Sequence, residues 1–301
     1  MRINSIDAAD FSAYAYAMSL LREIAVSIVD VTLTFAWTFP ITIALEFLFP
    51  HKNKQPLARL QGAAIWAIYF VLTGVILVAE AKAIAAIPLE PLVSIEFPRT
   101  NVFFIICGTV FFFVVVDFLY YWAHRAQHSR YLWRFHAVHH GIRDLNAVNS
   151  YHHWTEELTR LPFIGLPLAY LIHLDILQSN VAAAIIVLHS GYVHSACRIH
   201  FPQFMLLGIA DNRFHRIHHS IEEKHFDKNF SVFTTIWDRM FGTAYFPEKD
   251  EWPATGVKGM AEIDSVTGFL LAKPKAESVL DDLDLTGAHK IEAVSESATT
   301  C

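Results

Sequence analysis

The chain has 301 residues, of which 54% are hydrophobic and 17% charged, and its mean hydropathy is +0.35, a composition typical of an integral membrane protein. The formal net charge of −6 excludes the basic excess that nucleic-acid binding requires. The three cysteines form no CxxC pair. The unusual feature of the composition is its 17 histidines.

Three apolar stretches come first along the chain. Residues 24–45 carry one charge and contain Pro40, where we predict a kink. Residues 62–79 are uncharged, and residues 102–122 carry only Asp117. Each stretch approaches the roughly 20 residues that cross a bilayer as a helix.

A fourth apolar region follows at residues 161–193 and is interrupted by Pro162 and Pro167. Its length suits two helices that cross or enter the bilayer. The sequence therefore predicts an all-α, multi-pass membrane bundle with about four apolar helices or helix pairs, and a histidine-rich helical cap.

We expect one integral-membrane domain over residues 1–273, with its histidine-rich core at about 102–246. The remaining residues, 274–301, are polar and partly acidic, and we predict that they are disordered.

The basic residues predict the orientation of the spans. Two loops that alternation places on one side contain Lys52, Lys54, Arg59, Arg125, Arg130, Arg134 and Arg143. The opposite side has mainly Lys82 and Arg99. Because cytoplasmic loops carry the excess of Lys and Arg, the histidine-rich cap is predicted to face the cytoplasm. The membrane is then a bacterial inner membrane, which we favour, or the endoplasmic reticulum.

Histidines recur at helical spacing in two places. The stretch "DFLYYWAHRAQHSRYLWRFHAVHH" begins at Asp117, and "HRIHH" begins at His215. Together they contain His124, His128, His136, His139, His140, His215, His218 and His219. Spacings of three and four residues put such side chains on one helical face.

Eight clustered imidazoles point to metal. A lone histidine in a membrane protein is usually a polar residue with a partner. Eight together without a metal would repel one another when protonated and leave donors unpaired when neutral. Neutral imidazole is a common ligand of first-row transition metals. Eight ligands are too many for one ion and suit two.

These motifs resemble those of the fatty acid hydroxylase/sterol desaturase superfamily, which comprises integral-membrane di-iron oxygenases. The resemblance runs from about Glu46 to Tyr245 and includes the closing block "HRIHHSIEEKHFDKNFSVFTTIWDRMFGT". It implies that the eight histidines bind two iron ions, which zinc could replace in a purified sample. It also implies an O2-dependent hydroxylase or desaturase of a lipid such as a sterol or fatty acyl chain.

Two further metal ligands are implied by position. His153 stands where the family has His-Pro-x-Glu, with Glu156 matching the acid and Trp154 replacing the proline. His194 matches a family histidine that is normally followed two residues later by Asn, where this chain has Ala196.

Three other residues are candidates for supporting roles. Asp117 lies inside a predicted span, and we expect its carboxylate to accept the N–H of a ligand histidine. The alternative is a packing hydrogen bond to a neighbouring Tyr or Trp. His189 and His225 are interpreted equally well as direct ligands or as structural residues beside the ligands.

The reducing electrons need a source outside the chain. The sequence contains no GxGxxG fingerprint, no cytochrome-type haem motif and no iron–sulfur cysteine spacing. We therefore expect a separate electron donor of the reductase, ferredoxin or cytochrome type, in the cytosol or the membrane.

Two other functions remain open from the residues alone. A membrane zinc-dependent lipid hydrolase would need fewer histidines and a carboxylate base beside the metal. A non-enzymatic protein that binds haem or transports metal would place its ligands within the spans. Neither the identity of the lipid nor the choice between hydroxylation and desaturation follows from the sequence.

Overall fold

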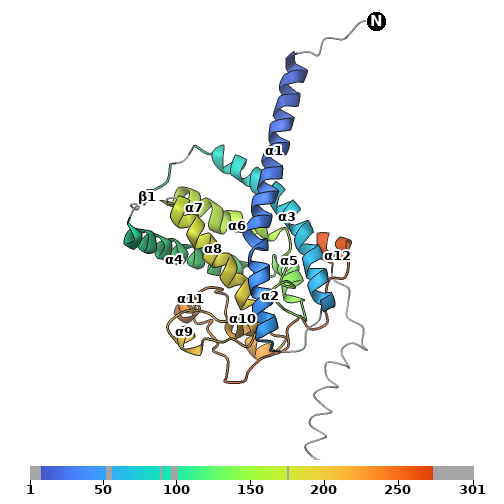
Figure 1. Cartoon of the computed structure of the whole chain (residues 1–301), viewed down its shortest axis with the longest axis vertical. Helices are drawn as coiled ribbons and strands as arrows, with labels where there is room; N and C mark the ends of the chain where they lie inside the picture. Colours follow the sequence, from blue (N-terminus) through green and yellow to red (C-terminus); the bar gives the residue numbers. More distant parts are fainter. Residues whose placement is uncertain (1–7, 52–55, 89, 96–100, 175, 274–301) are drawn as a thin grey trace, which may run out of the picture.

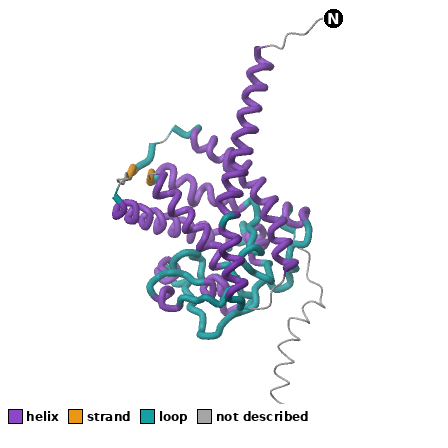
Figure 2. Tube along the Cα trace, in the orientation of Figure 1, coloured by secondary structure: helices purple, strands orange, loops and turns teal. Residues whose placement is uncertain are grey.

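A computed structural model describes residues 8–51, 56–88, 90–95, 101–174 and 176–273 and shows a mostly helical protein (Figures 1 and 2). The polar tail at 274–301, predicted to be disordered, lies outside the described residues.

Three long segments carry the apolar sequence. Their helices are α1 (Ala8–Ala36), α2 (Thr38–Leu48), α3 (Pro56–Ala85) and α4 (Val102–Gln127). The parts that are long and apolar enough to cross a membrane are Tyr14–Leu48, Leu57–Ala85 and Val102–Gln127. The predicted multi-pass helical fold is confirmed at the level of these three spans.

Near Pro40 the helix is interrupted only at Trp37, between α1 and α2, and Trp37 itself keeps right-handed helical angles. Proline has no backbone N–H to donate, and its ring meets the carbonyl four residues earlier, here that of Ala36. The two helices together still form one apolar segment of 35 residues.

The fourth apolar region differs from two regular helices. It contains the π-helix η1 (Leu161–Gly165), α7 (Leu166–Tyr170), the strand β2 (Ile172–Leu174) and α8 (Ile176–Val193). Pro162 and Pro167 lack backbone donors, which accounts for the irregular first half. The strand β1 (Val93–Ile95) pairs in parallel with β2, with Val93 opposite Ile172.

The long helices pack in pairs, with α1 against α3 and both α2 and α4 against α8. Trp66 of α3 is at the centre of a buried cluster, with Phe35, Phe39 and Phe70 around its ring. Its indole N–H donates to the carbonyl of Val148 at 2.9 Å. The membrane helices thereby hold the loop that follows the first histidine motifs.

Short helices and long loops make up the other end of the molecule, away from the start of α1 (Figures 1 and 2). These helices are α5 (Trp133–His140), α6 (Glu156–Arg160), α9 (Pro202–Leu206), α10 (Asn212–His218), η2 (Glu223–His225), α11 (Ile236–Met240) and α12 (Val266–Leu270). The C-terminal segment closes this end, since Trp154 donates to the carbonyl of Leu270 at 3.2 Å.

Gly62 marks the closest approach between α3 and this region. A Cβ at this position would lie 2.6 Å from the carbonyl oxygen of Val148 and 2.8 Å from the Cα of Asn149. Both contacts are with backbone, so the loop itself would have to move.

We predict that Gly62→Ala destabilises the protein by about 1–3 kcal/mol because it overpacks this contact. The control is Gly165→Ala, whose new Cβ would meet only the flexible side chain of Leu161, at 3.2 Å. Thermal unfolding in detergent measures the difference. Equal midpoints for the two variants would contradict the close contact.

Candidate metal centre

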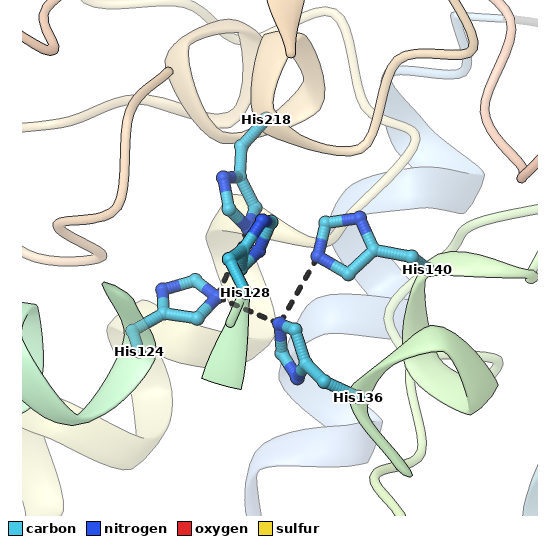
Figure 3. A group of neighbouring side chains, drawn as sticks. All are labelled: His124, His128, His136, His140 and His218. Atoms are coloured by element: carbon cyan, nitrogen blue, oxygen red, sulfur yellow. Dashed lines mark hydrogen bonds between the residues drawn. The ribbon is translucent and has the colours of Figure 1, made fainter. Parts of the chain in front are cut away.

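Five histidines from three segments converge in one group, shown in Figure 3. We call this the first histidine group, and it consists of His124, His128, His136, His140 and His218. One ring nitrogen from each lies within 4.8 Å of those of the others. The Nε2 of His124 is 3.0 Å from that of His136 and 2.9 Å from that of His218.

Four more histidines form a second histidine group: His139, His194, His215 and His219. The Nε2 of His194 lies 3.2 Å from that of His139 and 2.9 Å from that of His215. The rings of His140 and His219 stack with centroids 4.5 Å apart, so the two groups are neighbours.

Two short helices serve both groups. Helix α5 places His136 and His140 in the first group and His139 in the second. Helix α10 begins at an N-cap, where the side chain of Asp211 accepts from the backbone N–H groups of Arg213 and Phe214. This cap fixes the start of the helix that carries His215 and His218.

Backbone carbonyls determine which ring nitrogen carries the proton in two histidines of each group. In the first group, Nδ1 of His124 donates to the carbonyl of Phe230 at 2.6 Å, and Nδ1 of His218 donates to that of Lys228 at 2.8 Å. A carbonyl oxygen can only accept, so in each neutral ring Nε2 keeps its lone pair.

The same arrangement occurs in the second group. Nδ1 of His139 donates to the carbonyl of Tyr151 at 3.0 Å, and Nδ1 of His194 donates to that of Ser190 at 2.7 Å. Their Nε2 lone pairs therefore face each other, as do those of His124 and His218. Two lone pairs cannot hydrogen-bond, whereas a cation between them is coordinated by both. The donor sets of both groups therefore fit transition-metal ions.

Burial keeps these imidazoles neutral. Removal from water disfavours the charged ring, and neighbouring histidines add to the effect. The pKa of His194 is lowered to about 3, and those of His139 and His219 lie well below the usual value. Burial also lowers the pKa of His136 to about 4, although Glu156 opposes the shift. The neutral ring is the form that binds a metal.

Glu156 and His152 lie directly behind the two groups. Glu156 accepts from Nδ1 of His136 at 3.2 Å and from Nδ1 of His152 at 3.0 Å. The ring of His152 stacks on that of His139 with centroids 3.9 Å apart. Glu156 therefore orients one ligand of the first group and one ring packed on the second.

His153, a predicted ligand, lies outside both groups. Its Nδ1 is 2.7 Å from Oγ1 of Thr155, and its ring packs against Phe135 and Phe269. Consecutive side chains in an extended segment point in opposite directions, so His152 faces the metal groups and His153 faces away. The sequence offered the pair His152-His153, and the resemblance selected the second member.

Asp117 has a different partner from those predicted. Its carboxylate accepts from Oγ1 of Thr234 at 2.6 Å and from the backbone N–H of Phe233 at 3.4 Å. It therefore ties α4 to the loop before α11 and orients no histidine, which corrects both interpretations of this residue.

His189 and His225 also lie outside the two histidine groups. His189 lies in α8, and its ring centroid is 5.7 Å from that of Phe233. His225 bonds to Ser220 through Nδ1 at 2.8 Å and to Glu251 through Nε2 at 3.1 Å. Both have structural contacts of their own.

Glu46 and Asp238 support the site: sequence reasoning missed Glu46, and it expected Asp238 to form a structural ion pair with Arg239. Glu46 is buried and accepts from the backbone N–H groups of Ala147 at 2.9 Å and Ala196 at 2.8 Å. Asp238 accepts from the backbone N–H of Phe230 at 2.8 Å, and the Phe230 carbonyl is the partner of His124. A charged residue at the end of a span was the available signal for Glu46.

A cavity of about 160 Å³ lies beside the second histidine group. His152 and His194 form part of its wall. Apolar side chains make up much of the remainder and include Phe35, Phe39, Trp66, Ile186, Val187 and Phe233. The second histidine group therefore adjoins an apolar space between helices that can cross a membrane.

Fold and site together define a membrane protein with two buried histidine groups that could hold metal ions. Residues 109–243 match the model of the fatty acid hydroxylase family. This match includes every histidine of the two groups and supports the predicted resemblance to the fatty acid hydroxylase/sterol desaturase superfamily.

Three relatives illustrate the range of the superfamily. Alkylglycerol monooxygenase of Danio rerio is 32% identical over 142 residues, which cover 46% of this chain and 30% of the relative. Ornithine lipid hydroxylase OlsE of Rhizobium tropici is 30% identical over 54% of this chain and 48% of the relative. Lathosterol oxidase of Rattus norvegicus is 29% identical over 54% of this chain and 53% of the relative. The chain thus spans about half or less of these relatives, and no solved structure matches it.

We predict that His152→Ala lowers the metal content of the purified protein and that His153→Ala does not. The first change removes a ring stacked on His139 and a partner of Glu156, whereas the second removes a ring packed among aromatic side chains. Loss of such an outer contact typically weakens metal binding by about 10- to 100-fold. Elemental analysis after dialysis against a weak chelator measures it, and the opposite ranking would favour His153 as the ligand.

Proposed function

We propose that the protein is a membrane-bound di-iron oxygenase that uses O2 and electrons from a separate donor to hydroxylate or desaturate an unactivated C–H position of a lipid. The sterol, fatty acyl and related lipids are the candidate substrates. The observation that carries this proposal is the apolar cavity whose wall includes His194 of the second histidine group.

The chemistry of the substrate argues for iron. An unactivated C–H bond has no acidic proton and no leaving group, so acid–base or nucleophilic catalysis cannot act on it. Iron ions that are held by histidine and reduced by a donor would activate O2, and the activated O2 would supply the oxidising power. The first histidine group would hold one ion and the second the other, with ring orientations fixed by backbone carbonyls.

The other residues of the site would position the substrate and keep it dry. Phe35, Phe39 and Phe233 line the cavity with apolar surface, which excludes water from the position to be oxidised. The spans let a lipid enter laterally from the bilayer. The names of the three relatives also refer to enzymes of lipids.

Hydrolysis and haem binding fit the geometry less well. Glu156 accepts hydrogen bonds from His136, His152 and Gln127, so it is poorly placed to act as the base of a hydrolase. A haem needs axial ligands on opposite faces of a wide planar ring. Nε2 atoms 2.9 Å apart, as in His124 and His218, leave no space for it.

The histidine groups are proposed to face the cytoplasm. The loops next to them carry most of the Lys and Arg residues that flank the spans. Reduced nicotinamide cofactors and their reductases are cytosolic, so a site that relies on a separate donor would need to face that side.

We predict that His139→Ala and His218→Ala each abolish formation of the oxidised lipid, because each removes a ligand from a different group. Each variant should also retain about one iron per chain in place of two, with expression largely unchanged because the helices fold in lipid. Lipid profiles of expressing cells, searched for gain of one oxygen or loss of two hydrogens, and elemental analysis provide the two measurements. Full product formation in either variant would remove the di-iron proposal.

The orientation is tested with cysteine labelling of sealed cells. A membrane-impermeant thiol reagent should label Ser94→Cys, in the exposed strand β1, and should not label Ser129→Cys, beside His128. The unsubstituted chain gives the background from the native cysteines, and permeabilised cells show that position 129 is reactive. Labelling at 129 with protection at 94 would invert the topology.

A further inference from the structure

We propose that the cavity recognises its lipid through a neutral oxygen of the substrate, a hydroxyl, ether or carbonyl, that accepts a hydrogen bond from Arg160. This inference rests on the proposed function, because it treats the cavity beside the second histidine group as the substrate site. It adds the chemical class of the lipid.

Arg160 is a charged residue in an otherwise largely apolar wall. It is the last residue of α6 and is followed by the irregular turn η1. Its side chain lines the same cavity as His152 and His194. One ligand can therefore contact the guanidinium and also reach the second histidine group.

Glu157 neutralises the charge of Arg160. Its carboxylate accepts from Nη1 of Arg160 at 2.7 Å and also from the hydroxyl of Tyr69. An anionic headgroup would bring a second negative charge beside Glu157 in a poorly solvated space, which is unfavourable. A neutral oxygen adds no charge to this pair.

One donor of the guanidinium is still available. Nε of Arg160 is shielded from solvent and has no hydrogen-bond partner within the described part of the chain. A buried N–H without an acceptor costs free energy, and a ligand oxygen would remove that cost.

Three hydroxyl groups of the wall already have acceptors within the protein. The hydroxyl of Thr38 donates to the carbonyl of Phe35 at 2.7 Å, and that of Ser150 donates to the carbonyl of Ala147 at 3.2 Å. The hydroxyl of Tyr69 donates to Glu157. Unlike these hydroxyls, the guanidinium of Arg160 keeps a buried N–H without an acceptor, so it can recognise a ligand oxygen.

A hydrogen bond at Arg160 would fix the position of the lipid along the cavity. The distance of each carbon from the oxygen would then determine which carbon lies next to His194. An alkane of the same length would slide and bind more weakly, because it leaves the Arg160 donor unpaired.

The test uses four probes that share a 16-carbon chain with bromine near one end, which is the end remote from the oxygen where there is one: hexadecanol, hexadecyl methyl ether, hexadecane and hexadecanoate. Bromine quenches tryptophan fluorescence on contact, and Trp66 lines the cavity. The protein is placed in lipid nanodiscs. The part of the quenching that occurs in the wild-type protein but not in Trp66→Phe reports binding in the cavity. The wild-type protein should bind the alcohol and the ether about tenfold more tightly than the alkane.

Arg160→Lys is the decisive variant, since lysine keeps the charge opposite Glu157 but lacks the Nε donor. The preference for the oxygen-containing probes should be lost. Arg59→Lys is the matched control, because Arg59 also pairs with a glutamate, Glu46 at 2.6 Å, and should keep the preference. If the lysine variant does not fold, binding of the ether by the wild-type protein still tests the proposal. An ether oxygen can only accept a hydrogen bond, so its preference over the alkane reports a donor in the cavity.

Equal binding of alcohol, ether and alkane by the wild-type protein would overturn the proposal. So would an unchanged preference in folded Arg160→Lys, or tightest binding of hexadecanoate. The assay needs neither iron nor O2, so its result is independent of whether the protein oxidises a lipid. Failure of the oxygenase proposal would instead appear as missing iron and missing product.

Discussion

The central constraint on this structure is that neutral imidazoles must hold their lone pairs toward one another inside a buried space. Nε2 of His124 faces that of His218, and Nε2 of His139 faces that of His194. Without a cation between them, each pair repels. The rest of the molecule must therefore resist rotation of these rings, and it does so with backbone carbonyls that accept from Nδ1, such as those of Phe230 and Ser190.

Those carbonyls belong to loops, so the loops must be rigid in turn. Buried carboxylates hold them by accepting backbone N–H groups. Glu46, at the end of the first span, binds Ala147 and Ala196, which flank the segments carrying His152 and His194. Asp238 does the same for the loop that orients His124. One of these carboxylates belongs to the end of a membrane helix and the other to the short helix α11, so both parts of the fold position the site.

Much of this arrangement follows from the sequence, and the remainder depends on tertiary contacts. Hydrophobic length alone predicted the three spans, and helical spacing placed the histidines of α5 and α10 on shared faces. The choice of His153 over His152 depended on the direction of one extended segment, which the sequence pattern leaves undetermined. The partner of Asp117 lies 117 residues further on at Thr234, beyond the reach of any local pattern. The two prolines after Arg160 excluded a regular helix there, but they did not predict which irregular helices form instead.

The two histidine groups face different surroundings, although they share helices. His128 of the first group has 10% of its side chain exposed, and its Nδ1 lies 3.5 Å from the exposed carboxylate of Asp227. His194 of the second group lines the apolar cavity. Helices α5 and α10 each contribute histidines to both groups, and α10 also packs against α8, the helix that leads to His194. Neighbouring ions held in this way would have one side toward water and one toward lipid, as a site that draws reductant and substrate from different phases requires.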